Sequence, residues 1–361
     1  MIKSPCKASG SRTRSDPEIP RFEPHPWCRG AHAQTIAGRY LNPRGLRLDS
    51  VNHDVDVDSG DRLRILESVP PTWKNGDPAA LLVHGLASCA RAPYMVRFAR
   101  RLLRLGVLVV RMNLRGAGDG FGLAHGFYHA GSSEDLRAVV SWMAARFPGS
   151  PIALVGFSLG GSLALKLAAE ASEQEVVGLD CVLAANPPID LAACAGTMRR
   201  LLNQLYGWNF AGALVAEVKR LHDLFPELGK PDLTRVRSVF DFDDRYTAPR
   251  NGFASARDYY SRSSVWPLIP RIRLSGLVVH AQDDPFIPAD SFARVRFPAN
   301  LPLELTRHGG HMGYLSRDSW LGDHRWLDAR LATWLAARWG ISANLMRPSS
   351  CSRERLCAPL S

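Results

Sequence analysis

The sequence lacks any apolar run close to the 18 or more residues needed to span a bilayer, and the apolar stretch 106–110 ends at Arg111. The first residues are polar, without the apolar segment of a secretion signal. The seven cysteines are scattered, odd in number and free of C-x-x-C pairs, which predicts reduced thiols and neither disulfides nor a zinc site. These absences predict a soluble, cytoplasmic protein with no integral membrane segment. They leave peripheral membrane contact open.

Lysine is also scarce, with 6 lysines against 39 arginines in a chain of formal charge +11. Residues 1–22 hold five basic and two acidic residues, and residues 346–361 hold three and one, so five of the eleven charges fall at the ends. No nucleic-acid-binding motif accompanies the charge, and we expect no nucleic-acid partner. Arg97, Arg100, Arg101 and Arg104 share one helical face, which favours a solvated outer face over an anion-binding patch.

Length and composition predict one large globular unit, because 361 residues that are 46% hydrophobic can bury a sizeable core. We expect a domain over 21–340, with a disordered tail at 1–20 and a flexible one at 341–361. A hairpin is expected over 51–69, and strands and helices then alternate, which predicts an α/β fold with a mostly parallel sheet covered on both faces. The expected strands are 79–84, 107–112, 151–156 and 178–185, and the expected helices are 93–105, 133–147 and 159–171.

The most informative motif is the sequence from Gly156 to Gly160, which reads G-F-S-L-G. It stands between an apolar strand-like run and a helix-like run. In a G-x-S-x-G elbow the glycines avoid collisions with nearby backbone, and the turn raises the serine hydroxyl above the carboxyl edge of a sheet. This context predicts that Ser158 is a nucleophile.

A serine nucleophile needs a base and an orienting acid, expected in the chain order Ser, Asp or Glu, His. An apolar strand over 275–281 leads into Asp283 and Asp284, and we favour Asp284 because prolines stiffen the loop after it; Asp283 stays as the alternative. A later apolar segment leads to His308 and His311. His311 is favoured as the base because glycines flank it, with His308 as its rival.

Ester or amide attack also requires donors for the oxyanion. The strand at 79–84 leads into the loop of His84, Gly85 and Leu86, so the backbone N–H groups of Leu86 and Leu159 are the expected donors. We interpret His84 as a residue that packs the loop. Tyr128, His129 and Asp135 are expected to pack beneath the site without a catalytic role.

Between 188 and 268 the chain carries more helix-like sequence than a bare α/β core needs, with helices expected at 197–206, 211–225 and 232–241. We interpret this segment as a helical cap over the nucleophile. Some of its apolar side chains could line an acyl pocket, although plain core is the commoner fate of such stripes. They are Leu201, Leu202, Leu205, Tyr206, Trp208 and Phe210.

The chain resembles the YheT-like branch of the α/β-hydrolases, which includes bacterial esterases and the eukaryotic lipid hydrolases called abhydrolase domain proteins 1 and 3. The resemblance covers about residues 22 to 340. It rests on ordered blocks that include His25-Pro-Trp27, His32-Ala-Gln-Thr35, His84-Gly-Leu86, Asn113-Leu-Arg-Gly116, Tyr128-His-Ala-Gly131, Gly156 to Gly160, Tyr246-Thr-Ala-Pro249, Asp283-Asp-Pro285 and His308 to Gly313. It implies a catalytic triad of Ser158, Asp284 and His311. The eukaryotic relatives carry an N-terminal membrane anchor, which is not visible in this sequence.

These observations predict a serine carboxylester hydrolase without a metal or organic cofactor. By resemblance, its substrate is a short-chain ester or a monoacylglycerol-like lipid. An acyltransferase, thioesterase or peptidase would use the same triad, and a non-catalytic binding protein on the same scaffold is a further alternative.

Overall fold

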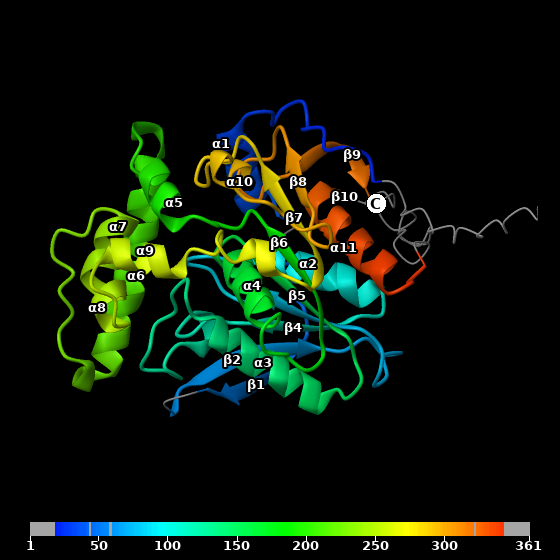
Figure 1. Cartoon of the computed structure of the whole chain (residues 1–361), viewed down its shortest axis with the longest axis horizontal. Coiled ribbons are helices and arrows are strands. Elements are labelled where there is room, and N and C mark those ends of the chain that lie inside the picture. Colours follow the sequence, from blue (N-terminus) through cyan, green and yellow to red (C-terminus); the bar gives the residue numbers. More distant parts are fainter. Residues whose placement is uncertain (1–18, 43–44, 58–59, 321–322, 343–361) are drawn as a thin grey trace, which may run out of the picture.

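The computed structural model describes residues 19–42, 45–57, 60–320 and 323–342. An eight-stranded sheet in the order β1-β2-β4-β3-β5-β6-β7-β8 forms its centre (Figure 1). The first two strands pair antiparallel to each other, β2 pairs antiparallel to β4, and the remaining pairs are parallel. The strands are β1 (Val51–Asp56), β2 (Arg62–Ser68), β3 (Ala79–Val83), β4 (Leu108–Met112), β5 (Ile152–Phe157), β6 (Leu179–Ala185), β7 (Ser275–Ala281) and β8 (Leu303–Thr306).

The central strands are uninterrupted apolar runs because both of their faces are covered. Every residue of β3, β4 and β5 is buried. Parallel strands with helices on both sides give this pattern, in contrast to the alternation of a half-exposed strand. Strands β3 and β5 pair with Val83 opposite Gly156, so the loops that follow them leave the sheet at the same edge.

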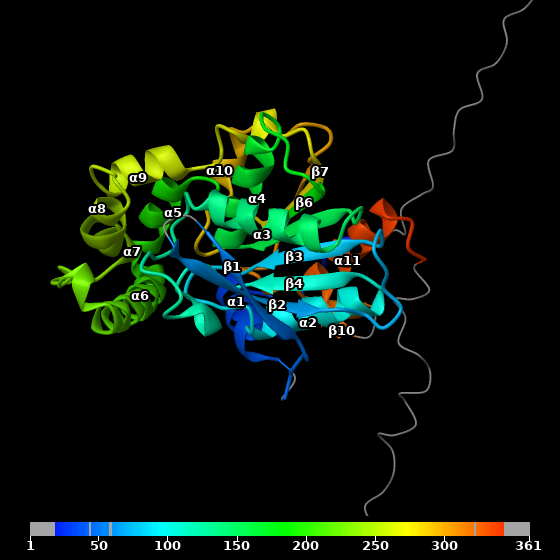
Figure 2. The same cartoon turned by 90° about the horizontal axis from the view of Figure 1, so that it is seen from below.

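Helices cover both faces of the sheet. Helices α3 (Ser133–Arg146) and α4 (Leu159–Glu170) pack on one face, and α2 (Pro93–Arg104) and α11 (Trp326–Arg338) on the other (Figure 2). The remaining elements of the domain are α1 (Ala31–Tyr40), α10 (Asp290–Ala293) and a small sheet of β9 (Leu315–Trp320) and β10 (Asp323–Arg325). The structure therefore confirms the expected α/β architecture.

A group of helices separates β6 from β7 and extends to one side of the sheet (Figure 1). They are α5 (Leu191–Met198), α6 (Gln204–Leu224), α7 (Val239–Phe242), a π-helical turn (Asp243–Thr247), α8 (Ala248–Arg250) and α9 (Ala256–Ser263). Short 3₁₀ turns lie at Gly118–Gly120, Leu201–Asn203, Pro226–Leu228 and Ile269–Arg271. This group falls within the expected cap at 188–268. Its action as a lid stays a prediction.

The sequence predictions were inaccurate inside this helical group. Helix α6 is one long element that runs through 207–210, where the sequence suggested a break between two helices. Gly207 lies close to the adjacent α5, since a Cβ atom on it would lie 3.4 Å from the Met198 carbonyl oxygen. The helix expected at 232–241 is wrong over most of its length. Asp232 instead accepts hydrogen bonds from Thr234, and Arg235 has φ +59°, which breaks a right-handed helix.

The expected solvated face of α2 is also wrong for two of its arginines. Arg97 bonds to Asp328, with a side chain only 11% exposed, and Arg101 bonds to Asp323 at 2.8 Å. These carboxylates lie in and just before α11, so the basic face of α2 joins this helix to the C-terminal part of the domain. Arg104 remains exposed. The tails predicted at 1–20 and 341–361 lie almost wholly outside the described residues.

Candidate active site

Ser158 stands at the sharp turn between β5 and α4. Its backbone has φ +51°, a conformation that L-residues rarely adopt. Gly156 makes the turn possible, and Gly160 lets the start of α4 lie close to the end of β3. A Cβ atom on Gly156 would lie 2.1 Å from the Gly160 carbonyl oxygen, and one on Gly160 would lie 2.4 Å from the Val83 carbonyl oxygen. Ser158 itself is half-buried, so its hydroxyl is held at the carboxyl edge of the sheet within reach of solvent.

The side chains of Ser158, His311 and Asp284 form one hydrogen-bonded chain. The Ser158 hydroxyl lies 2.9 Å from His311 Nε2, and His311 Nδ1 lies 2.8 Å from Asp284 Oδ2. Because an ionised carboxylate only accepts, Nδ1 carries the ring proton and Nε2 is left to accept from the hydroxyl. The three residues follow β5, β8 and β7, whose carboxyl ends meet at the same edge of the parallel sheet. The structure thus brings together the three residues chosen from the sequence.

Asp284 is buried, and its environment keeps it ionised. Its Oδ1 accepts from the backbone N–H groups of Phe286 and Ile287, at 2.8 and 3.1 Å, and its Oδ2 also accepts from Asn186 Nδ2 at 2.7 Å. Burial by itself raises the pKa of this carboxyl, but the charge and hydrogen bond of His311 outweigh it and hold the pKa below its usual value. A fixed, charged acceptor therefore orients the imidazole.

The two rival residues lie next to the triad but do not join it. Asp283 Oδ1 accepts from the backbone N–H of Gly310 at 2.8 Å, and its Oδ2 lies 3.5 Å from Nδ1 of His308. Burial raises the pKa of Asp283, opposed by the Gly310 amide and by His308. The His308 side chain is 48% exposed. This second carboxylate–imidazole pair holds the glycine loop that carries His311.

The expected oxyanion loop is tied down on both sides of Leu86. The N–H of Gly85 donates to the Tyr94 hydroxyl at 3.0 Å, and the N–H of Ala87 donates to the Tyr128 hydroxyl at 2.9 Å. Ala87 has φ +49°, so the turn after Leu86 is strained and needs such anchoring. A Cβ atom on Gly85 would lie 3.5 Å from Ser158 Oγ, which places the loop directly against the nucleophile.

The two proposed oxyanion donors have their N–H groups free within the described part of the chain. No hydrogen bond there uses the amide of Leu86, or that of Leu159, which is the first residue of α4. The start of a helix also carries partial positive charge, which favours an anion. Both loops follow neighbouring strands, β3 and β5.

His84 has the packing role expected for it. It is fully buried, its Nε2 accepts from the Leu114 N–H at 3.0 Å, and its Nδ1 donates to the Gly85 carbonyl at 2.7 Å. Burial lowers the pKa of His84 to about 4, so the ring is neutral at physiological pH and serves as a bridge between two loops.

Sequence reasoning missed two residues that position the triad. Thr35 of α1 accepts the His311 backbone N–H on its hydroxyl at 2.9 Å, and Asn186, which follows β6, bonds both Asp284 and the Gly310 carbonyl. Thr35 belongs to one of the blocks that carry the family resemblance, so a signal for it existed. No local pattern singled out Asn186, which is buried with φ +46°.

The apolar residues expected to line an acyl pocket, Leu201 to Phe210, divide into two sets. Phe286 packs its ring 4.9 Å from His311, and Tyr206 and Phe210 pack against Phe286 at 4.9 and 5.8 Å. These aromatic rings form an apolar wall beside the imidazole. The other set was expected to line a pocket or join the core, and this expectation is wrong, because its side chains are exposed to solvent: Leu201, Leu202, Leu205 and Trp208.

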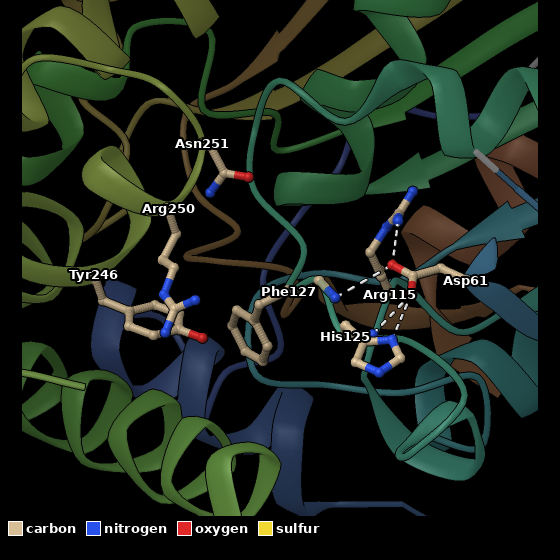
Figure 3. A pocket seen from close by; sticks show the side chains of 8 residues that line it. Asp61, Arg115, His125, Phe127, Tyr246, Arg250 and Asn251 are labelled. Atoms are coloured by element: carbon tan, nitrogen blue, oxygen red, sulfur yellow. Dashed lines mark hydrogen bonds and ion pairs between the residues drawn. The ribbon is translucent and has the colours of Figure 1, made fainter. Parts of the chain in front are cut away.

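A separate cavity of about 310 Å³ lies where the helical group meets the loops after β1 and β4, and no triad residue lines it (Figure 3). At its base, Arg115 bonds both Asp61, at 2.6 Å, and Asp135. Asp135 is buried, as expected, and its function is to anchor Arg115. Phe127 lines the cavity and stacks on Tyr128, the residue that holds the Ala87 amide.

Within residues 19–42, 45–57, 60–320 and 323–342, no helix has the length and apolar character to cross a bilayer. The same residues contain no cluster of three or more His, Cys, Asp or Glu side chains arranged for a metal ion.

Comparisons with known proteins show which family the chain is similar to. A profile of the alpha/beta hydrolase family matches residues 80–342. The YheT protein of Escherichia coli strain K12, named as a candidate esterase, is 30% identical over 84% of this chain and 89% of its own length. Mouse phospholipase ABHD3 is 28% identical over 66% of this chain, and the monoacylglycerol lipase of Saccharomyces cerevisiae is 27% identical over 72%. The chain spans 58% and 59% of the lengths of these two relatives.

Among solved structures, the esterase Pf2001 of Pyrococcus furiosus superimposes with a TM-score of 0.53 at 17% identity, over 83% of this chain and 96% of its own. This likeness concerns the fold. The family profile covers most of the chain and the bacterial relative matches nearly end to end, so the protein belongs to the α/β-hydrolase family and, within it, to the YheT-like group.

Proposed function

We propose that this protein is a serine hydrolase that cleaves carboxylic esters through an acyl-enzyme. The observation that carries the proposal is the unbroken hydrogen-bonded chain from Ser158 through His311 to Asp284. The esterase and lipase names of its relatives support ester hydrolysis as the class of reaction.

In the first half-reaction, Ser158 Oγ bonds to the ester carbonyl carbon while its proton passes to His311 Nε2. Asp284 stabilises the imidazolium that results. The carbonyl oxygen becomes an oxyanion and accepts hydrogen bonds from the Leu86 and Leu159 N–H groups, each worth about 3 kcal/mol of barrier in comparable enzymes. Collapse of the tetrahedral intermediate then breaks the carbon–oxygen bond to the leaving group, and the alcohol departs with the proton from His311.

The second half-reaction repeats these steps with water. His311 takes a proton from a water molecule, whose oxygen attacks the acyl carbon, and the acid is released as Ser158 Oγ regains its proton. None of these steps needs a cofactor. The fixed position of the imidazole between Asp284 and Ser158 suits it to act as base and then as acid.

We propose a short-chain ester or a monoacylglycerol-like lipid as the substrate. The wall of Phe286, Tyr206 and Phe210 beside His311 supports an apolar acyl group. The lipid substrates in the names of the mouse and yeast relatives point to the longer of these substrates. Initial rates on p-nitrophenyl esters from acetate to palmitate distinguish them. A lipid enzyme gives rates that rise with chain length, and a small-ester enzyme gives rates that fall beyond butyrate.

The central test is covalent labelling with a fluorophosphonate probe, followed by mass determination. We expect wild type to gain one adduct and Ser158→Ala to gain none. Ser162→Ala is the matched control, because Ser162 lies one turn further along α4 and donates its hydroxyl to the Pro188 carbonyl at 2.9 Å. Absence of labelling in wild type, or labelling that persists in Ser158→Ala, contradicts the proposal and favours a binding protein on this scaffold.

Acyl transfer is the second candidate, favoured by the relative in S. cerevisiae named medium-chain fatty acid ethyl ester synthase/esterase 2, which is 25% identical over 67% of this chain. Adding alcohols to the assay separates the two reactions, because a transferase gives a new ester in place of free acid. A panel of ester, thioester and amide substrates tests thioesterase and peptidase activity. The cytoplasmic location expected from the sequence stays a prediction.

A further inference from the structure

Exposed apolar side chains are concentrated in two short segments. Fourteen large apolar residues are exposed in the described part of the chain, and eight of them fall within 27–41 and 201–208. Trp27 is 92% exposed, Leu201 81% and Leu202 80%. A soluble protein does expose scattered apolar residues, but a concentration of this kind marks an interaction surface. We call the exposed apolar side chains of these two segments the apolar rim.

Both segments are attached directly to the loops that carry the triad. Helix α1 contacts the base through Thr35, which bonds the His311 N–H. At the beginning of α6, Asn203 Nδ2 donates to the Pro285 carbonyl, next to Asp284, at 2.7 Å. The exposed sides of the same two segments carry the apolar rim, so it lies next to the active-site loops.

The two segments also contact each other. The His32 ring of α1 stacks on the Tyr206 ring of α6 with a centroid distance of 5.7 Å, and His32 Nδ1 lies 3.3 Å from the Tyr206 hydroxyl. Tyr206 in turn packs against Phe286, whose ring adjoins His311. The two segments that carry the apolar rim are therefore in contact beside the catalytic base, although they are more than 150 residues apart in the sequence.

The charge of this surface has one sign. Exposed arginines accompany the apolar residues, namely Arg29 and Arg39 in the first segment and Arg199 and Arg200 immediately before the second. The sequence has no acidic residue from 24 to 48 or from 191 to 216. Among the described residues, none of these four arginines forms an ion pair with a carboxylate, so their charge is available to an outside partner.

We propose that the apolar rim docks this protein onto an anionic lipid surface, with its leucines and tryptophans inserted among the acyl chains and its arginines on the headgroups. This pattern of large apolar residues with unpaired cations is what interfacial attachment requires. A second copy of the chain fits less well. A two-fold interface would place arginines against arginines with no carboxylate in either segment to pair with them.

Docking in this orientation presents the triad edge of the sheet to the bilayer. If the proposed ester hydrolysis holds, a lipid substrate reaches Ser158 from the membrane without passing through bulk water. The attachment itself does not depend on catalysis, and it is tested with catalysis removed.

The test is flotation of the full chain carrying Ser158→Ala with vesicles of phosphatidylcholine, alone or in a roughly two-to-one mixture with phosphatidylglycerol. We expect binding to the mixed vesicles and weaker binding to the neutral ones. Adding Leu201→Ser and Leu205→Ser should lower the partition coefficient by roughly tenfold for each leucine that inserts. The matched control is Val51→Ser with Val177→Ser, which removes exposed apolar residues outside the apolar rim and should leave binding unchanged.

A second pair of variants tests the charge and does not alter the apolar surface. Arg199→Gln with Arg200→Gln should weaken binding to the mixed vesicles on the order of tenfold and leave binding to neutral vesicles unchanged. Arg104→Gln with Arg273→Gln is its control, since both residues are exposed and precede strands β4 and β7 at the opposite edge of the sheet. Thermal unfolding of each variant checks that it folds.

Three outcomes overturn the inference: no flotation of the Ser158→Ala protein with either vesicle, equal losses in test and control variants, or a leucine-dependent dimer in sedimentation with no leucine-dependent flotation. The last result would identify the surface as an interface between copies of this chain. Failure of ester hydrolysis with flotation intact would refute the proposed function alone.

Discussion

Replacing Tyr128 with Phe should slow catalysis without weakening substrate binding. The Tyr128 hydroxyl accepts the N–H of Ala87, the residue after the proposed oxyanion donor Leu86. The substitution keeps the buried ring and removes only this acceptor. The Ala87 backbone, held at φ +49°, can then relax and turn the Leu86 N–H away from the oxyanion.

The expected losses of kcat and of unfolding free energy in Tyr128→Phe follow from two known magnitudes. Loss of one oxyanion donor costs about 3 kcal/mol of barrier, which is roughly a hundredfold in kcat. The Leu86 donor is misplaced and not removed, so we expect a loss of about ten- to a hundredfold. The unpaired Ala87 N–H should also cost about 1–3 kcal/mol of unfolding free energy. KM should change little, because the oxyanion interaction forms mainly in the transition state.

The assay is steady-state kinetics on a p-nitrophenyl ester, with the affinity for a trifluoromethyl ketone inhibitor as a second measurement. Inhibitor affinity should fall together with kcat, because the inhibitor forms an oxyanion on Ser158. Tyr246→Phe is the matched control. It removes another buried tyrosine hydroxyl, which bonds His222 Nε2 at 3.0 Å in the helical group, and should lower stability only. An unchanged kcat in a folded Tyr128→Phe enzyme, or equal losses in both variants, would refute the reasoning.

Two further predictions concern the triad and the elbow. Asp284→Asn should lower kcat by about 10⁴-fold with little change in KM, because an amide in this position favours the wrong imidazole tautomer; a loss below about tenfold in steady-state kinetics would exclude the proposed orienting function. Gly156→Ala should destabilise the fold by several kcal/mol, because its Cβ would lie 2.1 Å from the Gly160 carbonyl oxygen, whereas Gly212→Ala, in an open position of α6, should stabilise it by about 0.5–1 kcal/mol. Urea unfolding of both variants measures the contrast.

The parts of the fold that depend on local pattern could be predicted from the sequence. The central strands are buried apolar runs bounded by turns, and each lies within about two residues of its expected range. The elbow is local in part, since Gly156 is needed by the turn of Ser158 itself, whereas Gly160 is needed because its Cβ would lie 2.4 Å from the Val83 carbonyl oxygen at the end of β3. Asp284 and His311 are distant in sequence, but each follows a strand of a parallel sheet, so the sheet order alone brings them to the same edge as Ser158.

The parts that depend on distant partners could not be predicted. Arg97 has the helical position of a solvent-exposed residue, and only its bond to Asp328, 231 residues away, explains its burial. The anchors of the oxyanion loop come from two separate segments, Tyr94 and Tyr128. The exposure of Leu201 and Leu205 could not be predicted from the sequence either, because a leucine stripe predicts burial, whereas both side chains are more than two-thirds exposed in the described part of the chain.

A final prediction concerns Asp243, a buried carboxyl in the helical group. Its oxygens accept hydrogen bonds from the Tyr260 hydroxyl, at 2.6 Å, and from the Thr247 hydroxyl, at 2.7 Å. Burial nevertheless raises the pKa of Asp243 to about 6. The unfolded chain therefore releases this proton at lower pH than the folded protein does. The free energy of unfolding contributed by Asp243 should fall by about 3 kcal/mol as the pH rises from about 4 to about 6, and stay constant above that.

Buried histidines give the opposite slope over part of the same range, so the effect must be isolated by difference. Burial lowers the pKa of His84, His129 and His280 to about 4. Protonation therefore favours the unfolded chain, and the folded protein loses stability as the pH falls below about 6.5. Urea unfolding of wild type and Asp243→Asn across pH 4 to 7 cancels this contribution, since both proteins keep the three histidines. As the pH rises from 4 to 7, the free energy of unfolding of Asp243→Asn should increase by about 3 kcal/mol relative to that of wild type. Tyr260→Phe removes a hydrogen bond to the ionised carboxylate, so the fall of unfolding free energy with pH should extend to higher pH than in wild type. If the difference in unfolding free energy between wild type and Asp243→Asn does not change with pH, Asp243 is already ionised in the folded protein at acidic pH.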